Sequence, residues 1–471
     1  MFELERQDVQ GLVVSAYSKL PCAAYLLLRV NNPAGVRKWL SQHVTEVTTS
    51  ENKNAHFHTN LAFTSTGLES LGLNQKVLST FSRPFQEGMA TDHRQRVLGD
   101  QEENDPAKWT WGGKNNPVGA LLLIYAKDEE VLNAQRQQRQ QELAANGFSE
   151  VAVLTAGRQP DSHEHFGFND GIGQPVMEGT GNKQRQLART NHATELPAGE
   201  FLMGFTNVYG VTADSPVVAA ADDPHKSLPD VPDDTTGLHA QSGMRDLGRN
   251  GTYLVFRQLV QDVAKFWDFV DRATRDSNDP LAPERLAAKF VGRWKSGAPL
   301  VLSSKGDDPG LGSENNFAYL DKDPNGFSCP IGSHIRRSNP RDALGPDAQT
   351  ALTSANRHRI LRRGRSYGPR AKDPRTADGI DRGLIFICLN SDIERQFEFV
   401  QQTWINNPVF GGLDGEVDPL VGNIPKGDCI FTVQGEPLRT RAHALSRFVT
   451  VKGGAYFFLP SIRALNYIAS L

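Results

Sequence analysis

The sequence predicts an α+β fold built from two ferredoxin-like (βαββαβ) domains with antiparallel sheets. The first observation is that strand-like and helix-like stretches alternate in the N-terminal third, in the order β-α-β-β-α-β. In this split arrangement both helices cover one face of an antiparallel sheet. The second observation is that much of the same order returns in the C-terminal half. We therefore expect two structurally similar halves along one chain.

The N-terminal elements follow from apolar periodicity and from residues that start or stop helices. Asn32 and Pro33 can begin a helix, because a short polar side chain caps free backbone N–H groups and proline suits the first helical position. Asn146-Gly147 can end a second helix. The expected elements are a strand over Cys22–Val30, a helix from Pro33, strands over His56–Thr64 and Gly119–Tyr125, a helix over Asp128–Ala145 and a strand over Val151–Leu154.

The C-terminal half repeats this pattern around a long irregular stretch. Apolar residues at helical spacing predict two helices, and Asn406-Asn407-Pro408 ends the second. No clear strand is visible in the middle, so one strand of the second unit stays unassigned. The expected elements are strands over Thr252–Leu259, Leu384–Leu389 and Arg447–Leu459, a helix with Val263, Phe266, Trp267 and Val270 on one face, and a helix with Ile393, Phe397, Val400 and Trp404 on one face.

An acidic, proline-rich stretch near residues 215–240 lies between these halves. Its composition is typical of a linker rather than of a helix or a strand. We therefore expect an N-terminal domain over residues 1–225 and a C-terminal domain over residues 226–471.

Composition and charge exclude several classes of protein. With 51 Lys and Arg against 54 Asp and Glu, the net charge of −3 argues against a nucleic-acid binder. No apolar run approaches the ~20 residues needed to span a bilayer. The N-terminal residues lack an apolar signal region behind a basic start, so we expect a cytoplasmic protein, or a mature form from which a leader was removed. The four cysteines lack zinc-ligand spacing and are expected to be free.

One segment is strongly basic although the whole chain is not. Between Arg336 and Arg375 there are eleven Lys or Arg and three Asp, a local charge of +8. Such a segment is either a solvated basic face or a pocket for an anionic ligand. It lacks the interleaved aromatic residues that a nucleic-acid patch would carry.

His334 stands at the start of this segment, in the sequence CPIGSHIRR. The two arginines that follow it disfavour protonation, so we expect a neutral imidazole, the form that binds iron. A single histidine is nevertheless more often structural than a ligand, and the residue alone does not decide between these roles.

The pattern G-x-x-D-G occurs twice, with Asp170 and with Asp414 at its centre. Glycines on both sides let the backbone turn tightly and approach a flat ligand, and the carboxylate between them could transfer a proton. Only the stretch around Asp170, EHFGFNDGIGQP, has aromatic residues on both sides of its central glycine. His163 and His165 precede it and are expected to be structural, because no further ligand accompanies them.

Three pieces of the sequence together resemble the dye-decolourising peroxidase family. The stretch around Asp170 is similar to the glycine-flanked catalytic aspartate motif of this family, and His334 is similar to its proximal haem histidine. Arg362, in RHRILRRGRSYG, is similar to its distal arginine. The resemblance covers most of the chain and is closest to the long members of the family. Asn169 departs from it, because the family often has arginine before the aspartate. Supporting similarity covers Phe85–Met89, Trp109–Gly112 and Gly383–Leu389.

The resemblance implies a non-covalent haem b in the C-terminal domain, with His334 as the iron ligand. It also implies that hydrogen peroxide and an aromatic reductant, such as a phenol or a bulky dye, are the partners of a monomer or homodimer. Asp170 would move protons on peroxide and Arg362 would stabilise charge. Asp418 would accept a hydrogen bond from His334, and Arg337 would pair with a haem propionate. The expected cofactor-binding residues are His334, Arg337, Gly171, Arg362, Leu384, Phe386 and Asp418.

Two other functions are left open by the sequence. A haem carrier or iron-releasing protein on the same fold would keep His334 but would not need Asp170. A protein without haem would use the basic segment to bind anions or nucleic acid. Trp404 is a candidate surface relay for electrons from bulky dyes, or else a core residue of its helix.

Overall fold

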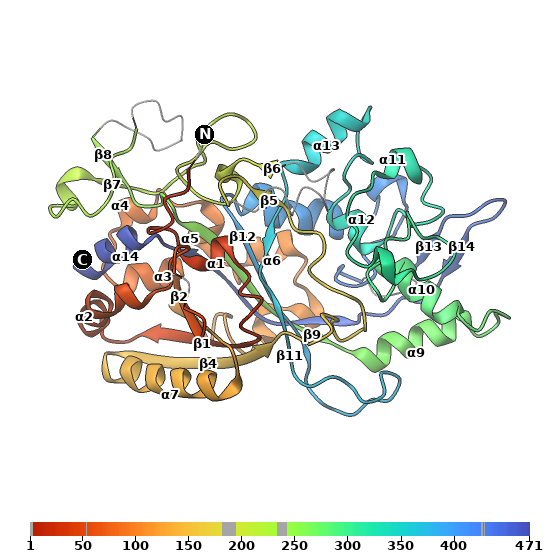
Figure 1. The fold of residues 1–471 in the computed structure, drawn as a ribbon, viewed down its shortest axis with the longest axis horizontal. Helices are drawn as coiled ribbons and strands as arrows, with labels where there is room; N and C mark the ends of the chain where they lie inside the picture. Colours follow the sequence, from red (N-terminus) through yellow and green to blue (C-terminus); the bar gives the residue numbers. More distant parts are fainter. Residues whose placement is uncertain (1–2, 53, 181–194, 233–242, 425–426, 428) are drawn as a thin grey trace.

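The computed structural model describes residues 3–52, 54–180, 195–232, 243–424, 427 and 429–471. Its centre is one large antiparallel sheet that extends through both halves of the chain (Figure 1). Helices and long loops surround this sheet.

The N-terminal half has the predicted ferredoxin-like order. Its strands run in the order β4-β1-β3-β2, all antiparallel. Asn32 caps the first helix by accepting a hydrogen bond from Gly35 N, and Asp128 caps the second by accepting one from Val131 N. The bounds are β1 Cys22–Val30, α2 Pro33–His43, β2 Phe57–Phe63, β3 Ala120–Ala126, α7 Glu129–Ala145 and β4 Phe148–Gly157.

The C-terminal half repeats this topology, which confirms the predicted fold class. Its strands run in the order β11-β12-β9-β15. The strand that the sequence left unassigned is the pair of short pieces β10 and β11, which carry arginines rather than an apolar alternation. The bounds are β9 Thr252–Gln261, α9 Val263–Thr274, β10 Leu361–Arg362, β11 Arg365–Tyr367, β12 Gly383–Asn390, π-helical turns over Glu394–Glu398 and Val400–Ile405, and β15 Val449–Leu459.

The two expected sheets are joined into one closed sheet. Gly157 of β4 pairs with Ser366 of β11, and Phe63 of β2 pairs with Phe458 of β15. Alternate residues of the long strands point into this closed sheet and form an apolar core there, while the residues between them face outward. Leu384 and Phe386 of β12 are outward residues, because Ile385 belongs to the interior core.

The remaining elements are short and lie around the sheet (Figure 1). The last helix, α14 Ile462–Ser470, packs against α2, so the C-terminus lies beside the N-terminal half. The other helices are α1 Gly11–Val14, α3 Ser65–Ser70, α4 Gln75–Leu78, α5 Arg83–Glu87, α6 Asp92–Leu98, α10 Ala282–Val291, α11 Tyr319–Lys322, α12 His334–Ser338 and α13 Ala348–Asn356. The other strands are β5 Val176–Met177, β6 Glu195–Leu196, β7 Val217–Ala219, β8 Met244–Asp246, β13 Phe431–Val433 and β14 Thr440–Ala442.

Part of the expected linker is structured. Val217–Ala219 pairs with Met244–Asp246 in a small antiparallel ribbon, and residues 233–242 lie outside the described part of the chain. The domain boundary between residues 225 and 226 stays a prediction. Among the described residues, no helix combines the length and the apolar character needed to cross a membrane.

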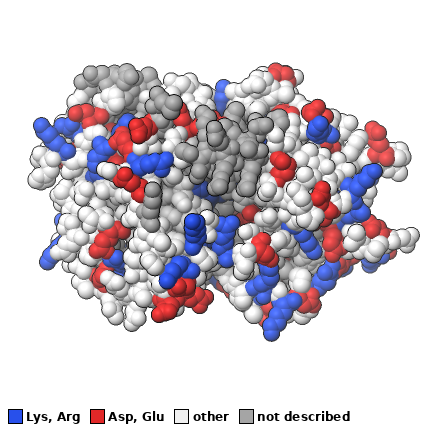
Figure 2. Space-filling model, in the orientation of Figure 1, with Lys and Arg blue, Asp and Glu red and all other residues white. Residues whose placement is uncertain are grey.

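The basic segment is not a solvated face. Five of its arginines are buried, and on the face drawn in Figure 2 blue and red side chains alternate without one dominant basic patch. Arg365 shows how such burial is tolerated, because its guanidinium donates to the carbonyls of Leu20, Ala16 and Tyr17. Five of the eleven Lys and Arg of the segment are therefore inside the protein, so the segment as a whole is not a solvated face. The buried arginines are Arg336, Arg337, Arg341, Arg359 and Arg365.

Candidate active site

Asp170 lies in the loop between β4 and β5. Its backbone N–H donates to Ser162 O at 3.0 Å, and its Oδ1 accepts from Gly171 N at 2.6 Å. Gly171 has a φ of +83°, a conformation that other residues rarely adopt, and a Cβ there would meet no atom within 4 Å. The loop thus holds the aspartate beside an open space.

Arg362 is brought to Asp170 by strand β10. Its Nη1 lies 3.3 Å from Asp170 Oδ1, and its backbone N–H donates to Gln174 Oε1 at 3.0 Å. The side chains of Arg362 and Asp170 are 33% and 48% exposed, so neither is sealed in the core. The structure therefore places these two predicted residues together with free surface in front of them.

His334 begins helix α12 and is fixed by a buried carboxylate. Its Nδ1 lies 2.9 Å from Oδ2 of Asp418, a side chain that is 0% exposed. The other oxygen of Asp418 accepts from the backbone N–H groups of Leu420 and Val421, both at 2.9 Å. Because this carboxylate only accepts, the neutral imidazole carries its proton on Nδ1, and Nε2 of that form has a lone pair for a metal.

The charges of this pair differ from the sequence-based expectation. Burial alone lowers the pKa of His334, but the adjacent Asp418 carboxylate outweighs burial and raises that pKa above its usual value. Burial raises the pKa of Asp418, but the imidazole outweighs this effect, so the pKa ends below the usual range. The expectation that neighbouring arginines set the protonation of His334 was wrong, because Asp418 dominates.

The structure shows Arg337 bound to backbone carbonyls of its own chain, and its predicted role in haem binding stays a prediction. Its side chain is fully buried, and its guanidinium donates to the backbone carbonyls of Trp404, Asn407 and Glu416 at 2.8, 3.0 and 2.7 Å. These carbonyls engage both Nη atoms, whereas Nε is buried without a partner among the described residues. The geometry gives Arg337 the role of holding α12 against the segment that carries Asp418.

Arg359 is a residue that the sequence reasoning counted but did not single out. It is buried, and its Nη2 has no hydrogen-bond partner among the described residues. Burial and the nearby charges of Arg341 and Arg362 lower the pKa of Arg359 to about 9. A buried cation without a counterion needs an anion to be stable. The only signal in the sequence was the density of arginines around it.

Leu384 and Phe386 occupy the outward face of β12 and are only half-buried. Cys388, on the same strand, pairs with Arg362, so β12 lies directly beside the strand of the site arginine. Phe386 also contacts the ring of Phe397, with centroids 6.0 Å apart. Their position is compatible with lining the site, and that role stays a prediction.

The second G-x-x-D-G match is an ordinary exposed turn. Asp414 is exposed and follows a short 3-10 turn over Phe410–Gly412. His163 pairs with Asp161, and His165 bonds the carbonyl of Tyr367, as expected for structural histidines. Within the described residues, no group of three or more His, Cys, Asp or Glu has the geometry of a metal site.

Trp404 is a core residue and not a surface one. Its side chain is 6% exposed and packs against the rings of His358 and Phe399. Its use as a surface electron relay is therefore not supported.

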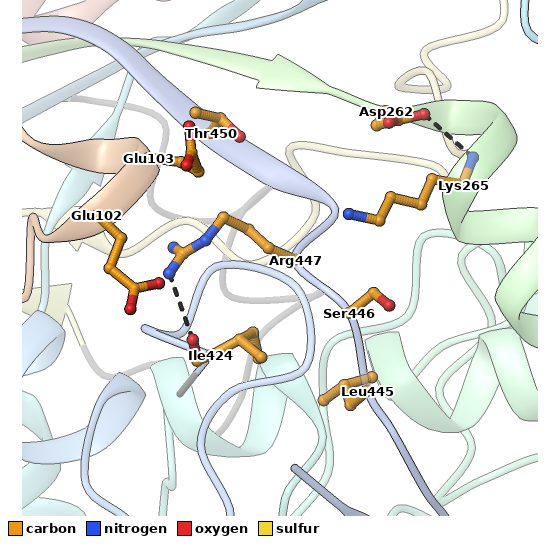
Figure 3. Close-up of a pocket in the computed structure, with 9 residues that line it drawn as sticks. All are labelled: Glu102, Glu103, Asp262, Lys265, Ile424, Leu445, Ser446, Arg447 and Thr450. Carbon is orange, nitrogen blue, oxygen red and sulfur yellow. Dashed lines mark hydrogen bonds between the residues drawn. The ribbon is translucent and has the colours of Figure 1, made fainter. Parts of the chain in front are cut away.

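A surface pocket of about 330 Å³ lies away from these residues (Figure 3). Lys265 and Arg447 both extend into it, with the guanidinium of Arg447 directed toward Glu102. None of the predicted site residues lines it, so it is not the candidate active site. Its lining is Glu102, Glu103, Asp262, Lys265, Ile424, Leu445, Ser446, Arg447 and Thr450.

The residues present fit an iron porphyrin. His334 offers one lone pair with a carboxylate behind it, which is the usual arrangement of an iron-binding imidazole. Arg362 and Asp170 lie close enough to influence the charge of His334. Arg359 supplies an unmatched positive charge for an acidic substituent of such a ligand.

Comparisons with known proteins point to one family. The family model for the DyP dimeric alpha+beta barrel domain matches residues 8–160. A dye-decolorizing peroxidase from Mycena epipterygia is 32% identical over 449 residues, covering 87% of this chain and 76% of that protein. The solved structure of a dye-decolorizing peroxidase in complex with 2,6-dimethoxyphenol has a TM-score of 0.77 at 26% identity, covering 99% of this chain and 100% of that chain.

The similarity to an iron-releasing protein, the alternative function, covers only part of the chain. A deferrochelatase from Yersinia pestis bv. Antiqua (strain Nepal516) is 29% identical, over 46% of this chain and 34% of its own length. The match to the Mycena protein extends over most of both chains at a higher identity. The chain therefore belongs to the dye-decolorizing peroxidase family.

Proposed function

We propose that this protein is a haem b peroxidase that uses hydrogen peroxide to oxidise phenolic compounds and bulky dyes in one-electron steps. The observation that carries the proposal is the combination of two pairs. The His334–Asp418 pair is suited to hold iron, and the Asp170–Arg362 pair lies within electrostatic reach of it. A simple haem carrier would need only the first pair.

His334 Nε2 would bind the iron, with Asp418 fixing the ring and increasing its electron donation. Gly171, Leu384 and Phe386 would contact the porphyrin, because the first leaves open space and the other two present apolar surface. We favour Arg359 over Arg337 as the partner of a propionate. When bound, haem supplies the redox chemistry that no side chain can provide.

The side chains supply proton transfer and charge stabilisation. Hydrogen peroxide must lose a proton from one oxygen and gain a proton on the other, which then leaves as water. Asp170 is the carboxylate that can take the first proton and return it to the departing oxygen. The guanidinium of Arg362, 3.3 Å from Asp170, stabilises the negative charge that develops as the O–O bond breaks.

The test of this function uses the wild-type protein. Haem added to the purified protein should give a Soret band at one haem per chain, and the complex should then oxidise 2,6-dimethoxyphenol only when hydrogen peroxide is present. This phenol is chosen because it is bound in the solved structure of a relative. A complex that binds haem but does not turn over would support the carrier function, and no haem binding would refute both.

We expect Arg359→Met to weaken haem binding by about tenfold or more, because a charge-assisted hydrogen bond contributes roughly 1.5–3 kcal/mol. Titration of the haem-free protein with haem measures this. The same change should stabilise the haem-free protein against heat, because it removes a buried cation. Arg370→Met is the matched control, since Arg370 is an exposed arginine of the same segment. Unchanged haem affinity in Arg359→Met would remove the propionate assignment.

A further inference from the structure

Glu164 is a buried carboxylate that the proposed chemistry does not use. It lies six residues before Asp170, in the same loop. Its Oε1 accepts from the backbone N–H of Phe168 at 2.9 Å, and its Oε2 accepts from the N–H of Phe166 at 2.8 Å. Oε2 also accepts from Gln261 Nε2 at 2.6 Å. Three donors from two different parts of the chain thus converge on one side chain.

The backbone folds around this carboxylate. Glu164 N donates to Phe168 O and Gly167 N donates to Glu164 O, both at 2.9 Å. Gly167 has a φ of +98°, which allows the chain to turn back toward the carboxylate. Since Gln261 ends strand β9, its bond ties the turn to the wall of the closed sheet.

Hydrogen bonds of the residues after Glu164 fix the backbone as far as Asp170. Asn169 donates through its backbone N–H to Lys295 O at 3.1 Å and through Nδ2 to Ser296 O at 3.2 Å. Asp170 N donates to Ser162 O, on the other side of Glu164. Asn169, the departure from the family pattern, therefore anchors the loop here instead of presenting a charge.

We infer that Glu164 is a positioning residue, which organises the loop so that the carboxylate of Asp170 faces Arg362. The inference rests on the proposed peroxidase function. A displacement of about 1 Å at a reacting group can cost on the order of 100-fold in rate. A glutamine cannot replace Glu164, because its amide has one acceptor and one donor end. Whichever way the amide turns, an N–H group meets an N–H group.

The charge of Glu164 gives this role a signature in pH. Burial raises the pKa of Glu164, the hydrogen bonds from Phe166, Gln261 and Phe168 offset part of this effect, and the negative charge of Asp170 adds to the rise. Arg370, which donates to the carbonyl of the neighbouring His163, is close enough for its own pKa to be raised slightly by Glu164. As pH falls through this raised pKa, the carboxylate gains a proton and loses an acceptor, so wild type comes to resemble Glu164→Gln. The ratio of their rates should therefore fall toward one.

The experiment compares Glu164→Gln with wild type after haem has been bound to both. We expect kcat/KM for hydrogen peroxide to be about 10- to 100-fold lower well above the pKa of Glu164, with equal haem content. The ratio should decrease at acid pH, whereas general damage to the fold would lower the rate equally at every pH. In the haem-free protein, hydrogen exchange of the amides of Phe166 and Phe168 should be faster in the variant, because these N–H groups lose their acceptor.

Asp161→Asn is the matched control. It removes the same charge from the same loop, but Asp161 bonds Arg370 and His163 and does not accept from the N–H groups of Phe166 and Phe168 that hold Glu164. This variant should keep the wild-type rate. If Glu164→Gln does not fold, Gln261→Leu takes its place, and a loss of about threefold to tenfold is expected because one of three bonds is removed.

Two results would overturn the inference while leaving the proposed function intact. The first result is that the wild-type protein oxidises the phenol and the Glu164→Gln protein has the same kcat/KM for hydrogen peroxide. The other is a loss of rate in Glu164→Gln that is constant between acid and alkaline pH. If wild type itself binds haem but shows no peroxide-dependent oxidation, the proposed function fails first, so the two failures are distinguished.

Discussion

Asp170→Asn is expected to lower kcat/KM for hydrogen peroxide by about 10²- to 10⁴-fold, the usual contribution of a positioned acid or base. Asparagine has the size of aspartate, so its amide oxygen can still accept from Gly171 N and from Arg362. It cannot take a proton from peroxide at neutral pH. The Soret band and the haem content should stay unchanged. Initial rates of 2,6-dimethoxyphenol oxidation at varied peroxide concentration measure the effect.

Asp414→Asn is the control that this chain itself provides. Asp414 stands at the centre of the second G-x-x-D-G sequence, in an exposed turn, so the same substitution is made in the same local pattern. It should leave the rate unchanged. If Asp170→Asn instead oxidised the phenol at the wild-type rate, proton transfer by this carboxylate would be excluded and a haem-carrying role would be favoured.

The elements that the sequence predicted well are those whose local signals agree with one another. Strand β1 was predicted with its observed bounds, Cys22–Val30, because the apolar run, the following cap at Asn32 and Pro33 all point to the same boundary. The short pieces Leu361–Arg362 and Arg365–Tyr367 were missed for the opposite reason. Arg365 is held by distant backbone carbonyls and Arg362 pairs with Asp170, and no periodicity along the chain reveals such partners.

The joining of both halves into one sheet was also beyond the sequence. Gly157 and Ser366 are 209 positions apart, and their pairing depends on the twist and register of all the strands between them. Sequence patterns show which face of a strand is apolar, but not which strand lies beside which. For this reason the fold class was predicted correctly whereas the closure was not.

In the candidate site, too, residues within a recognisable motif were predicted better than residues whose role depends on distant neighbours. The resemblance identified Asp170, Arg362 and His334, and the structure brings Asp170 and Arg362 into contact. For the surrounding residues the outcome was mixed, because their roles depend on neighbours distant in sequence. Asp418 does bond His334, but Arg337 is occupied by three backbone carbonyls. At Arg359 a buried Nη2 has no partner among the described residues, and this depends on an environment that the sequence does not show.

His334→Ala is expected to abolish stable haem binding. The Nδ1 of His334 bonds the buried carboxylate of Asp418, which leaves Nε2 available for the iron. Alanine offers no such ligand. The variant should lose haem on gel filtration, and its peroxide-dependent rate should fall to background. Added imidazole, which can enter the space left by the side chain, should partly restore the Soret band. That rescue would distinguish loss of the ligand from loss of the fold.

Two controls make this result specific. His93→Ala removes an exposed histidine that pairs with Glu87, and it should bind haem as wild type does. Asp418→Asn keeps the ligand but removes the charge behind it, so haem should stay bound with a shifted spectrum and about 10- to 100-fold lower affinity or activity. A His334→Ala protein that held haem with an unaltered spectrum would show that another residue binds the iron. In that case Asp170 and Arg362 would face no iron centre, and their pairing would have to be explained by the stability of the loop alone.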